Sequence, residues 1–146
     1  MLRLTDYFSR ISHLNYAVTK WDVPYIPEDF PKSYPIGKDL DLYVDENDLE
    51  SIKTITKIFL NLYKPFFDVR VVDKATNVKY RLEKRKKLHY QFDIEVDKEF
   101  LLQNRRLRNS FWILSLENEI RVRKKEVSKN PKKLHHVEWL EKFSTQ

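Results

Sequence analysis

The sequence has 146 residues, 41% of them hydrophobic and 14% aromatic, which is enough to fill the core of one domain and excludes a disordered chain. Lys and Arg total 28 against 22 Asp and Glu. The net charge of +6 suits an anionic partner such as a nucleotide, nucleic acid or phosphorylated substrate, and it is equally typical of a lysine-rich soluble surface. Cysteine is absent, and no apolar run approaches the roughly 20 residues that span a bilayer, so we expect a cytoplasmic protein without disulfides or membrane contact.

The N-terminal part predicts a helix followed by a short strand. Apolar residues recur at three- and four-residue spacing, the pattern of an amphipathic helix, with Thr5 as its candidate N-cap: Leu4, Tyr7, Phe8, Ile11 and Leu14. Residues 16–18 are typical of a strand that ends near Lys20. Four prolines then predict an irregular connection over residues 22–35, and its aromatic residues indicate that it packs against the domain.

Residues 37–44, GKDLDLYV, form the strand on which our functional interpretation depends. A period of two places Asp39 and Asp41 on one face and Leu40, Leu42 and Val44 on the other. The Cβ atoms of the two aspartates are then roughly 7 Å apart. Paired carboxylates favour a divalent cation such as Mg²⁺, and the alternative is a strand end whose acids face water.

A helix and three strands are expected next. Asp45 is the candidate N-cap of a helix that ends before Pro65. Its buried stripe would consist of Leu49, Ile52, Ile55, Ile58 or Phe59, and Leu62. Residues 67–72, 77–83 and 88–96 predict strands that pair antiparallel because short turns join them.

The third of these strands has the clearest alternation in the sequence. One face would carry Leu88, Tyr90, Phe92, Ile94 and Val96, and the other Lys87, His89, Gln91, Asp93 and Glu95. Asp93 would meet Asp39 and Asp41 if both apolar faces cover the same helices. We expect His89 and Gln91 to be ordinary surface residues.

The rest of the chain is predicted to be helical. Ser115 is a candidate N-cap, and Asn130–Pro131 would start a last helix whose buried side is Leu134, Val137, Leu140 and Phe143. The expected fold class is α+β: a small mixed β-sheet with helices packed on one face and a C-terminal helical hairpin. Residues 1–109 would form the α+β core, and residues 110–146 the hairpin packed on it.

The stretch Gly37–Val44 resembles the aspartate strand of the nucleotidyltransferase fold, the DNA polymerase β-like superfamily. The resemblance covers most of the chain in element order and, at the level of motifs, Asp39, Asp41 and Asp93. It implies that Asp39 and Asp41 bind two Mg²⁺ (or Mn²⁺) ions and that Asp93 binds the activating one. It also implies transfer of a nucleoside monophosphate from a nucleoside triphosphate to the hydroxyl of an unknown acceptor.

The sequence differs from the pattern of the superfamily after the first strand. There the superfamily commonly has a Gly-Ser or Gly-Gly pair whose backbone N–H groups hold the triphosphate, and this sequence has Thr19-Lys20-Trp21. Lys20 would meet a phosphate with a point charge instead. Together with Gly37 and Lys38 it completes the expected nucleotide-binding set.

Other functions are less well matched. No Asp or Glu is followed two residues later by Lys, which argues against a restriction-type nuclease. Basic clusters at residues 84–87, 105–108 and 121–125 favour, as the alternative, a non-catalytic basic protein of the same fold that binds nucleic acid or a phosphorylated partner. His135 and His136 are adjacent on a helix and so cannot both face one metal ion.

Overall fold

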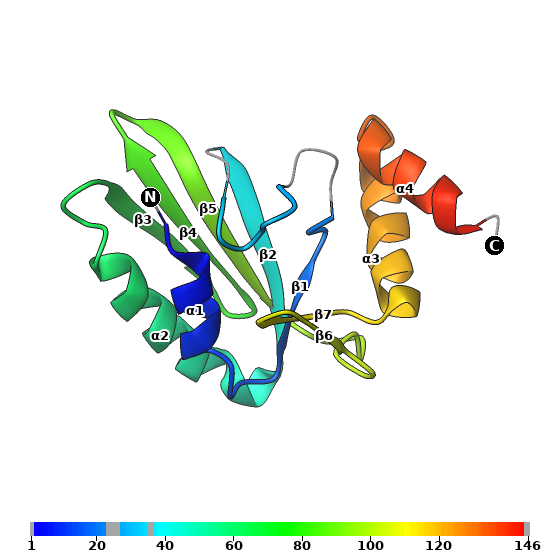
Figure 1. Cartoon of the computed structure of the whole chain (residues 1–146), viewed down its shortest axis with the longest axis horizontal. Coiled ribbons are helices and arrows are strands. Elements are labelled where there is room, and N and C mark those ends of the chain that lie inside the picture. The colour runs from blue at the N-terminus through cyan, green and yellow to red at the C-terminus, as the bar shows by residue number, and fades with distance from the viewer. Residues whose placement is uncertain (1, 23–26, 35–36, 145–146) are drawn as a thin grey trace.

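A computed structural model describes residues 2–22, 27–34 and 37–144 and shows an α+β fold, as predicted (Figure 1). Of the proline-rich connection, residues 23–26 and 35–36 lie outside the described residues. In the described part of that connection Phe30 and Tyr34 are buried, which confirms that it packs against the domain. The elements are α1 (Leu4–Arg10), β1 (Tyr16–Thr19), β2 (Lys38–Val44), the 3₁₀ turn η1 (Glu46–Asp48), α2 (Leu49–Asn61), β3 (Asp68–Lys74), β4 (Asn77–Lys84), β5 (Lys87–Val96), β6 (Arg106–Arg108), β7 (Phe111–Ile113), α3 (Leu116–Lys129) and α4 (Leu134–Ser144).

The strands of the described residues form one mixed sheet in the order β3-β4-β5-β2-β1-β7-β6. The strands β3, β4 and β5 pair antiparallel, as their short turns predicted. The strand β2 pairs parallel with β5 and antiparallel with β1, so the aspartate strand lies in the interior of the sheet. This position fixes which face each of its side chains occupies.

The prediction that everything after β5 is helical was wrong, because β6 and β7 form a hairpin. The carboxylate of Asp97 accepts hydrogen bonds from the backbone N–H groups of Leu101 and Leu102, at 3.0 and 2.9 Å, and organises the turn before this hairpin. Asn109, with a φ of 53°, adopts the left-handed conformation in its tight turn. Strands of three residues are too short for a period of two to be visible in the sequence.

The main core lies between α1, α2 and the apolar face of the sheet. The ring centroid of Tyr7 is 5.0 Å from that of Phe92, and the Tyr7 hydroxyl lies 2.8 Å from Oγ1 of Thr56. The residues of the predicted stripe are buried as expected, although Ile11 and Leu14 follow the end of α1 at Arg10. Thr5 is not its cap, because α1 already begins at Leu4 and has no side-chain cap.

The helix α2 ends at Asn61, before Pro65 as predicted. Of the alternatives Ile58 and Phe59, Phe59 is the buried one, whereas Ile58 is 53% exposed. Leu62 is 55% exposed, so its predicted burial was wrong, and Thr56 and Leu60 are buried in addition. Asp45 caps the preceding turn η1, because its side chain accepts a hydrogen bond from the Asn47 N–H at 3.0 Å.

The C-terminal helices stand beside the other face of the sheet, away from α1 and α2 (Figure 1). Val122 of α3 belongs to a small second cluster with Ala17 and Tyr43, which point away from the main core. Ser115 caps α3, as predicted. The last helix begins at Leu134 rather than at Pro131, and Leu134 is 66% exposed, so its predicted burial was wrong. Among the described residues, no helix has the length and apolar character needed to cross a bilayer.

Candidate functional site

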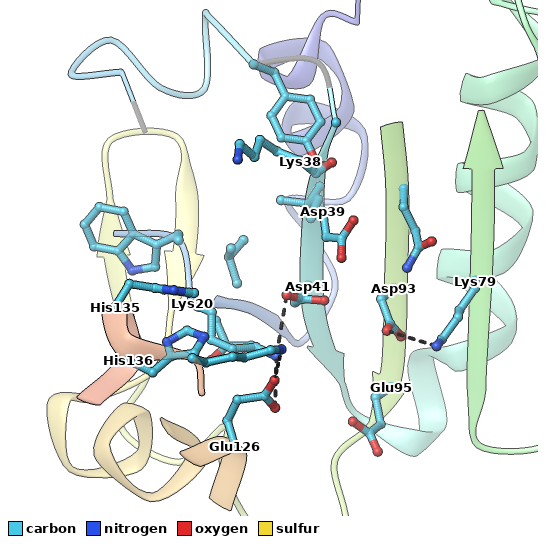
Figure 2. Close-up of a pocket in the computed structure, with 18 of the residues that line it drawn as sticks. Lys20, Lys38, Asp39, Asp41, Lys79, Asp93, Glu95, Glu126, His135 and His136 are labelled. Carbon is cyan, nitrogen blue, oxygen red and sulfur yellow. Dashed lines mark hydrogen bonds and ion pairs between the residues drawn. The ribbon is translucent and has the colours of Figure 1, made fainter. Parts of the chain in front are cut away.

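The candidate site lies where β2 and β5 run side by side. Their parallel register places Asp41 directly opposite Asp93, and Asp39 opposite Gln91. Burial of the alternate apolar residues on both strands forces these polar side chains to the other face. Asp39, Asp41 and Asp93 therefore line one cavity of about 660 Å³, the arrangement expected from the strand alternation (Figure 2).

Two lysines already pair with the central carboxylates. The Nζ atom of Lys20 lies 3.6 Å from Oδ2 of Asp41. On the other strand, Asp93 accepts a hydrogen bond of 2.6 Å from the side-chain amide of Asn77. Figure 2 shows its ion pair with Lys79, in which Oδ2 of Asp93 lies 3.9 Å from Nζ. Each of these aspartates thus has a cation beside it.

Burial rather than mutual repulsion is the main electrostatic feature of the aspartates. It raises the pKa of Asp41 to about 6, with smaller contributions from Asp93 and Asp39, whereas Lys20 lowers it. Burial also raises the pKa of Asp39, followed by the charge of Asp93. The ammonium of Lys20 therefore does not fully offset the factors that disfavour ionisation of Asp39 and Asp41.

Lys20 remains an ammonium in this environment. Its burial favours the neutral amine, but the neighbouring carboxylates of Asp41 and Glu126 outweigh that effect and raise its pKa. Gly37 and Lys38, the other two predicted nucleotide-binding residues, also line the cavity. Gly37 has a φ of 87°, which favours glycine, and its N–H donates to the His89 carbonyl at 2.6 Å.

The turn after β1 is built around a buried glutamate of α3. Lys20 has a φ of 54°, an uncommon conformation for a residue with a side chain. Its backbone N–H lies 3.2 and 3.3 Å from the two carboxylate oxygens of Glu119, and the Thr19 hydroxyl donates to Glu119 at 2.9 Å. The backbone N–H at the point where the resemblance places phosphate donors is therefore bonded to an internal carboxylate.

A buried arginine holds the two C-terminal helices to this turn. The side chain of Arg123 is 1% exposed and forms ion pairs with Glu119 and Asp22. Its guanidinium lies 4.0 Å from the ring centroid of Trp139 in α4, and the indole N–H of Trp139 donates to Asp22 at 2.9 Å. These contacts fix α3 and α4 at one side of the cavity.

The sequence analysis missed the wall of the cavity that α3, α4 and their connection supply. This helical wall consists of Glu126, Lys129, Lys133, His135 and His136. Glu126 forms ion pairs with Lys20, at 3.8 Å, and with Lys133. A signal existed in the sequence: Glu119, Arg123 and Glu126 have the spacing of a single helix face, which is unusual for acids that only face water.

The chemistry of the aspartates fits a divalent cation. Their oxygens are the hard ligands that Mg²⁺ prefers, and positive charge added beside Asp41 would relieve its partly buried negative charge. Within residues 2–22, 27–34 and 37–144, no group of three or more His, Asp or Glu side chains is arranged so that it could hold a metal ion. The roles of Asp39, Asp41 and Asp93 as metal ligands and catalytic residues stay predictions.

No protein-family model matches the chain, and no curated protein matches it. Two solved structures align with part of the chain. JHP933 from Helicobacter pylori aligns with a TM-score of 0.47 and 14% identity over 82% of this chain and 52% of its own. A candidate nucleotidyltransferase from H. pylori aligns with a TM-score of 0.47 and 11% identity over 82% of this chain and 54% of its own. This chain thus spans about half the length of either protein, and neither match carries an argument about function.

Proposed function

We propose that the chain is a nucleotidyltransferase-like protein that binds a nucleoside triphosphate and a divalent cation in the cavity. Asp39, Asp41 and Asp93 would hold Mg²⁺ or Mn²⁺, and Lys20 and Lys38 would contact phosphate. The observation that supports this proposal is that three carboxylates, from two neighbouring strands, line one cavity that lysines also line. The resemblance of residues 37–44 to the aspartate strand of that fold gives this observation its interpretation.

The proposed reaction transfers a nucleoside monophosphate to a hydroxyl group. The hydroxyl oxygen bonds to the α-phosphorus while the bond from that phosphorus to the bridging oxygen breaks. Pyrophosphate leaves with the electron pair, and the hydroxyl proton passes to a cavity carboxylate. When bound, a divalent cation supplies activation of the hydroxyl and neutralisation of the pyrophosphate.

Titration calorimetry with ATP, in millimolar Mg²⁺ and in EDTA, tests this proposal. We expect Mg²⁺-dependent binding in the wild-type protein and its loss, by about tenfold or more, in Asp41→Asn and Asp93→Asn. The matched control is Asp68→Asn, because Asp68 is an exposed aspartate at the start of the edge strand β3. Equal Mg²⁺-dependent affinity in Asp41→Asn and Asp68→Asn would contradict the proposal.

The ion pairs of Lys20 with Asp41 and of Lys79 with Asp93 favour a second candidate function. In a non-catalytic basic protein of the same fold these ammonium groups would take the place of metal ions, and the chain would bind nucleic acid or a phosphorylated partner. Affinity for a single-stranded oligonucleotide would then fall steeply with salt and be unaffected by EDTA. Loss of this binding in EDTA would contradict the second candidate.

A further inference from the structure

The two walls of the cavity carry opposite charges. The sheet wall presents four carboxylates and two lysines: Asp39, Asp41, Asp93 and Glu95 with Lys38 and Lys79. The helical wall presents one carboxylate, two lysines and two histidines. A ligand that is cationic at one end and anionic at the other would match this separation, with its anionic end on the helical wall.

One carboxylate, that of Glu126, lies among the basic residues of the helical wall. Glu126 forms ion pairs with Lys133 through one oxygen and with Lys20 through the other, so it lies between two ammonium groups. Burial opposes its ionisation, but Lys133 and Lys20 together lower the pKa of Glu126. The ammonium groups of Lys20 and Lys133 therefore stabilise an anion that lies between them.

His136 adds a buried polar atom with no partner. The residue is 3% exposed and lines the cavity, and its Nδ1 has no hydrogen-bond partner in the part of the chain that the structure describes. Leaving a buried polar group unpaired is unfavourable, and a ligand that hydrogen-bonds to it would remove that cost. Burial, together with His135, Arg123 and Lys20, lowers the pKa of His136 to about 4, so the ring is neutral at pH 7 and one ring nitrogen carries a proton.

Lys129 is the second lysine of the helical wall. It lines the cavity at the end of α3, its side chain is exposed, and it has no ion-pair partner among the described residues. The turn after β1, by contrast, has no N–H to offer at Lys20, because Glu119 already accepts that bond. Phosphate oxygens that enter the cavity thus find the ammonium of Lys129 and the unpaired ring nitrogen of His136 on the helical wall, rather than the backbone N–H of Lys20.

We propose that Lys129, Lys133 and His136 of the helical wall, with Lys20, form a polyphosphate-binding site in which Glu126 acts as an internal anion until the ligand displaces it. In this proposal, side chains of α3, α4 and their connection bind the phosphate groups, because the backbone N–H of Lys20 after β1 is already bonded to Glu119. The proposal rests on the proposed function for the identity of the anion as the polyphosphate of a nucleotide. It adds a binding site on a wall that the sequence resemblance does not include.

Inorganic triphosphate in EDTA, titrated by calorimetry into the whole chain, tests this site without any metal. We expect wild-type binding, a loss of about tenfold in Lys129→Gln and in Lys133→Gln, and a gain of about threefold or more in Glu126→Gln. Lys124→Gln is the matched control, because Lys124 is an exposed lysine of α3 that does not line the cavity, and it should leave the affinity unchanged. Lys129 has no ion pair to lose, so its variant remains informative even if Lys133→Gln loosens the helices.

The outcomes separate this proposal from the proposed function. Equal affinities in Lys129→Gln and Lys124→Gln would overturn the site, and weaker binding in Glu126→Gln would overturn the role of Glu126. Asp41→Asn should bind triphosphate in EDTA at least as well as the wild-type protein, because it removes a negative charge from the cavity. Triphosphate binding in EDTA without Mg²⁺-dependent ATP binding would support the helical-wall site and refute the metal-dependent function.

Discussion

On the face of the sheet that meets α1 and α2, the strand β2 contributes Leu40, Leu42 and Val44 to a dry core. On the opposite face the same strand presents Asp39 and Asp41 to a cavity closed by charged side chains of α3 and its connection to α4. The first face is held by apolar area and ring contacts, which depend little on pH. The second is held by buried ion pairs, whose contribution depends on partners and protonation. The two faces of one strand thus differ in how their contribution to stability depends on pH, and the ligand binding proposed above would fall on the charged face.

The largest expected effect lies on the core face. Phe92 is fully buried beside Tyr7 and Phe59, so Phe92→Ala removes apolar contacts and leaves a cavity. We expect the free energy of unfolding to fall by about 3–5 kcal/mol, measured by urea denaturation. A fall below 1 kcal/mol would mean that this face does not supply the main stability of the domain.

On the cavity face, Arg123→Met should have the next largest effect. The side chain of Glu119 is buried, and without the guanidinium its charge would lose an ion pair while that of Asp22 would lose another. We expect a loss of about 3 kcal/mol at pH 7 by the same measurement. Combining it with Glu119→Gln should restore part of that loss, because the uncompensated charge is then removed. Additive losses in the double variant would contradict the buried-charge explanation.

Asp41→Asn should have the opposite sign and a smaller size. Because the pKa of Asp41 is raised from 3.8 to about 6 in the folded chain, the folded state binds more protons than the unfolded state between these values. Stability contributed by this group is therefore present at low pH and lost as the pH rises to about 6. In EDTA the variant should be more stable than the wild-type protein by on the order of 1–2 kcal/mol at pH 8, and by much less near pH 4.5. Thermal unfolding at both pH values measures the difference, and a variant less stable at pH 8 would assign Asp41 a structural role.

The strands and the faces of their side chains could be predicted because alternation over seven or more residues is a strong local signal. This alternation predicted that Asp39 and Asp41 lie on the opposite face of the sheet from Leu40 and Leu42. It likewise placed Asp93 opposite the face of Phe92 and Ile94. The hairpin of β6 and β7 could not be predicted, since three-residue strands have too few alternations to be recognised.

The helical wall could not be predicted from the sequence for a different reason. Which residues of α3 face the sheet can be read from their spacing, but the turn that brings Lys133 and His136 back over the cavity follows from the angle between α3 and α4. That angle depends on tertiary contacts such as Arg123 against Trp139 and Trp139 against Asp22. None of these pairs is close in the sequence, so no local pattern indicates them.

The parallel pairing of β2 with β5 has a consequence for the order of folding. The segment between these strands, residues 45–86, contains α2, β3 and β4, and the hairpins of β3, β4 and β5 involve only contacts local in sequence. Joining β2 to β5 must close this whole segment as a loop, which costs chain entropy that local hairpins do not. The cavity therefore cannot assemble before this long-range pairing has formed, and a partly folded chain with its β3–β5 meander intact would still lack the site.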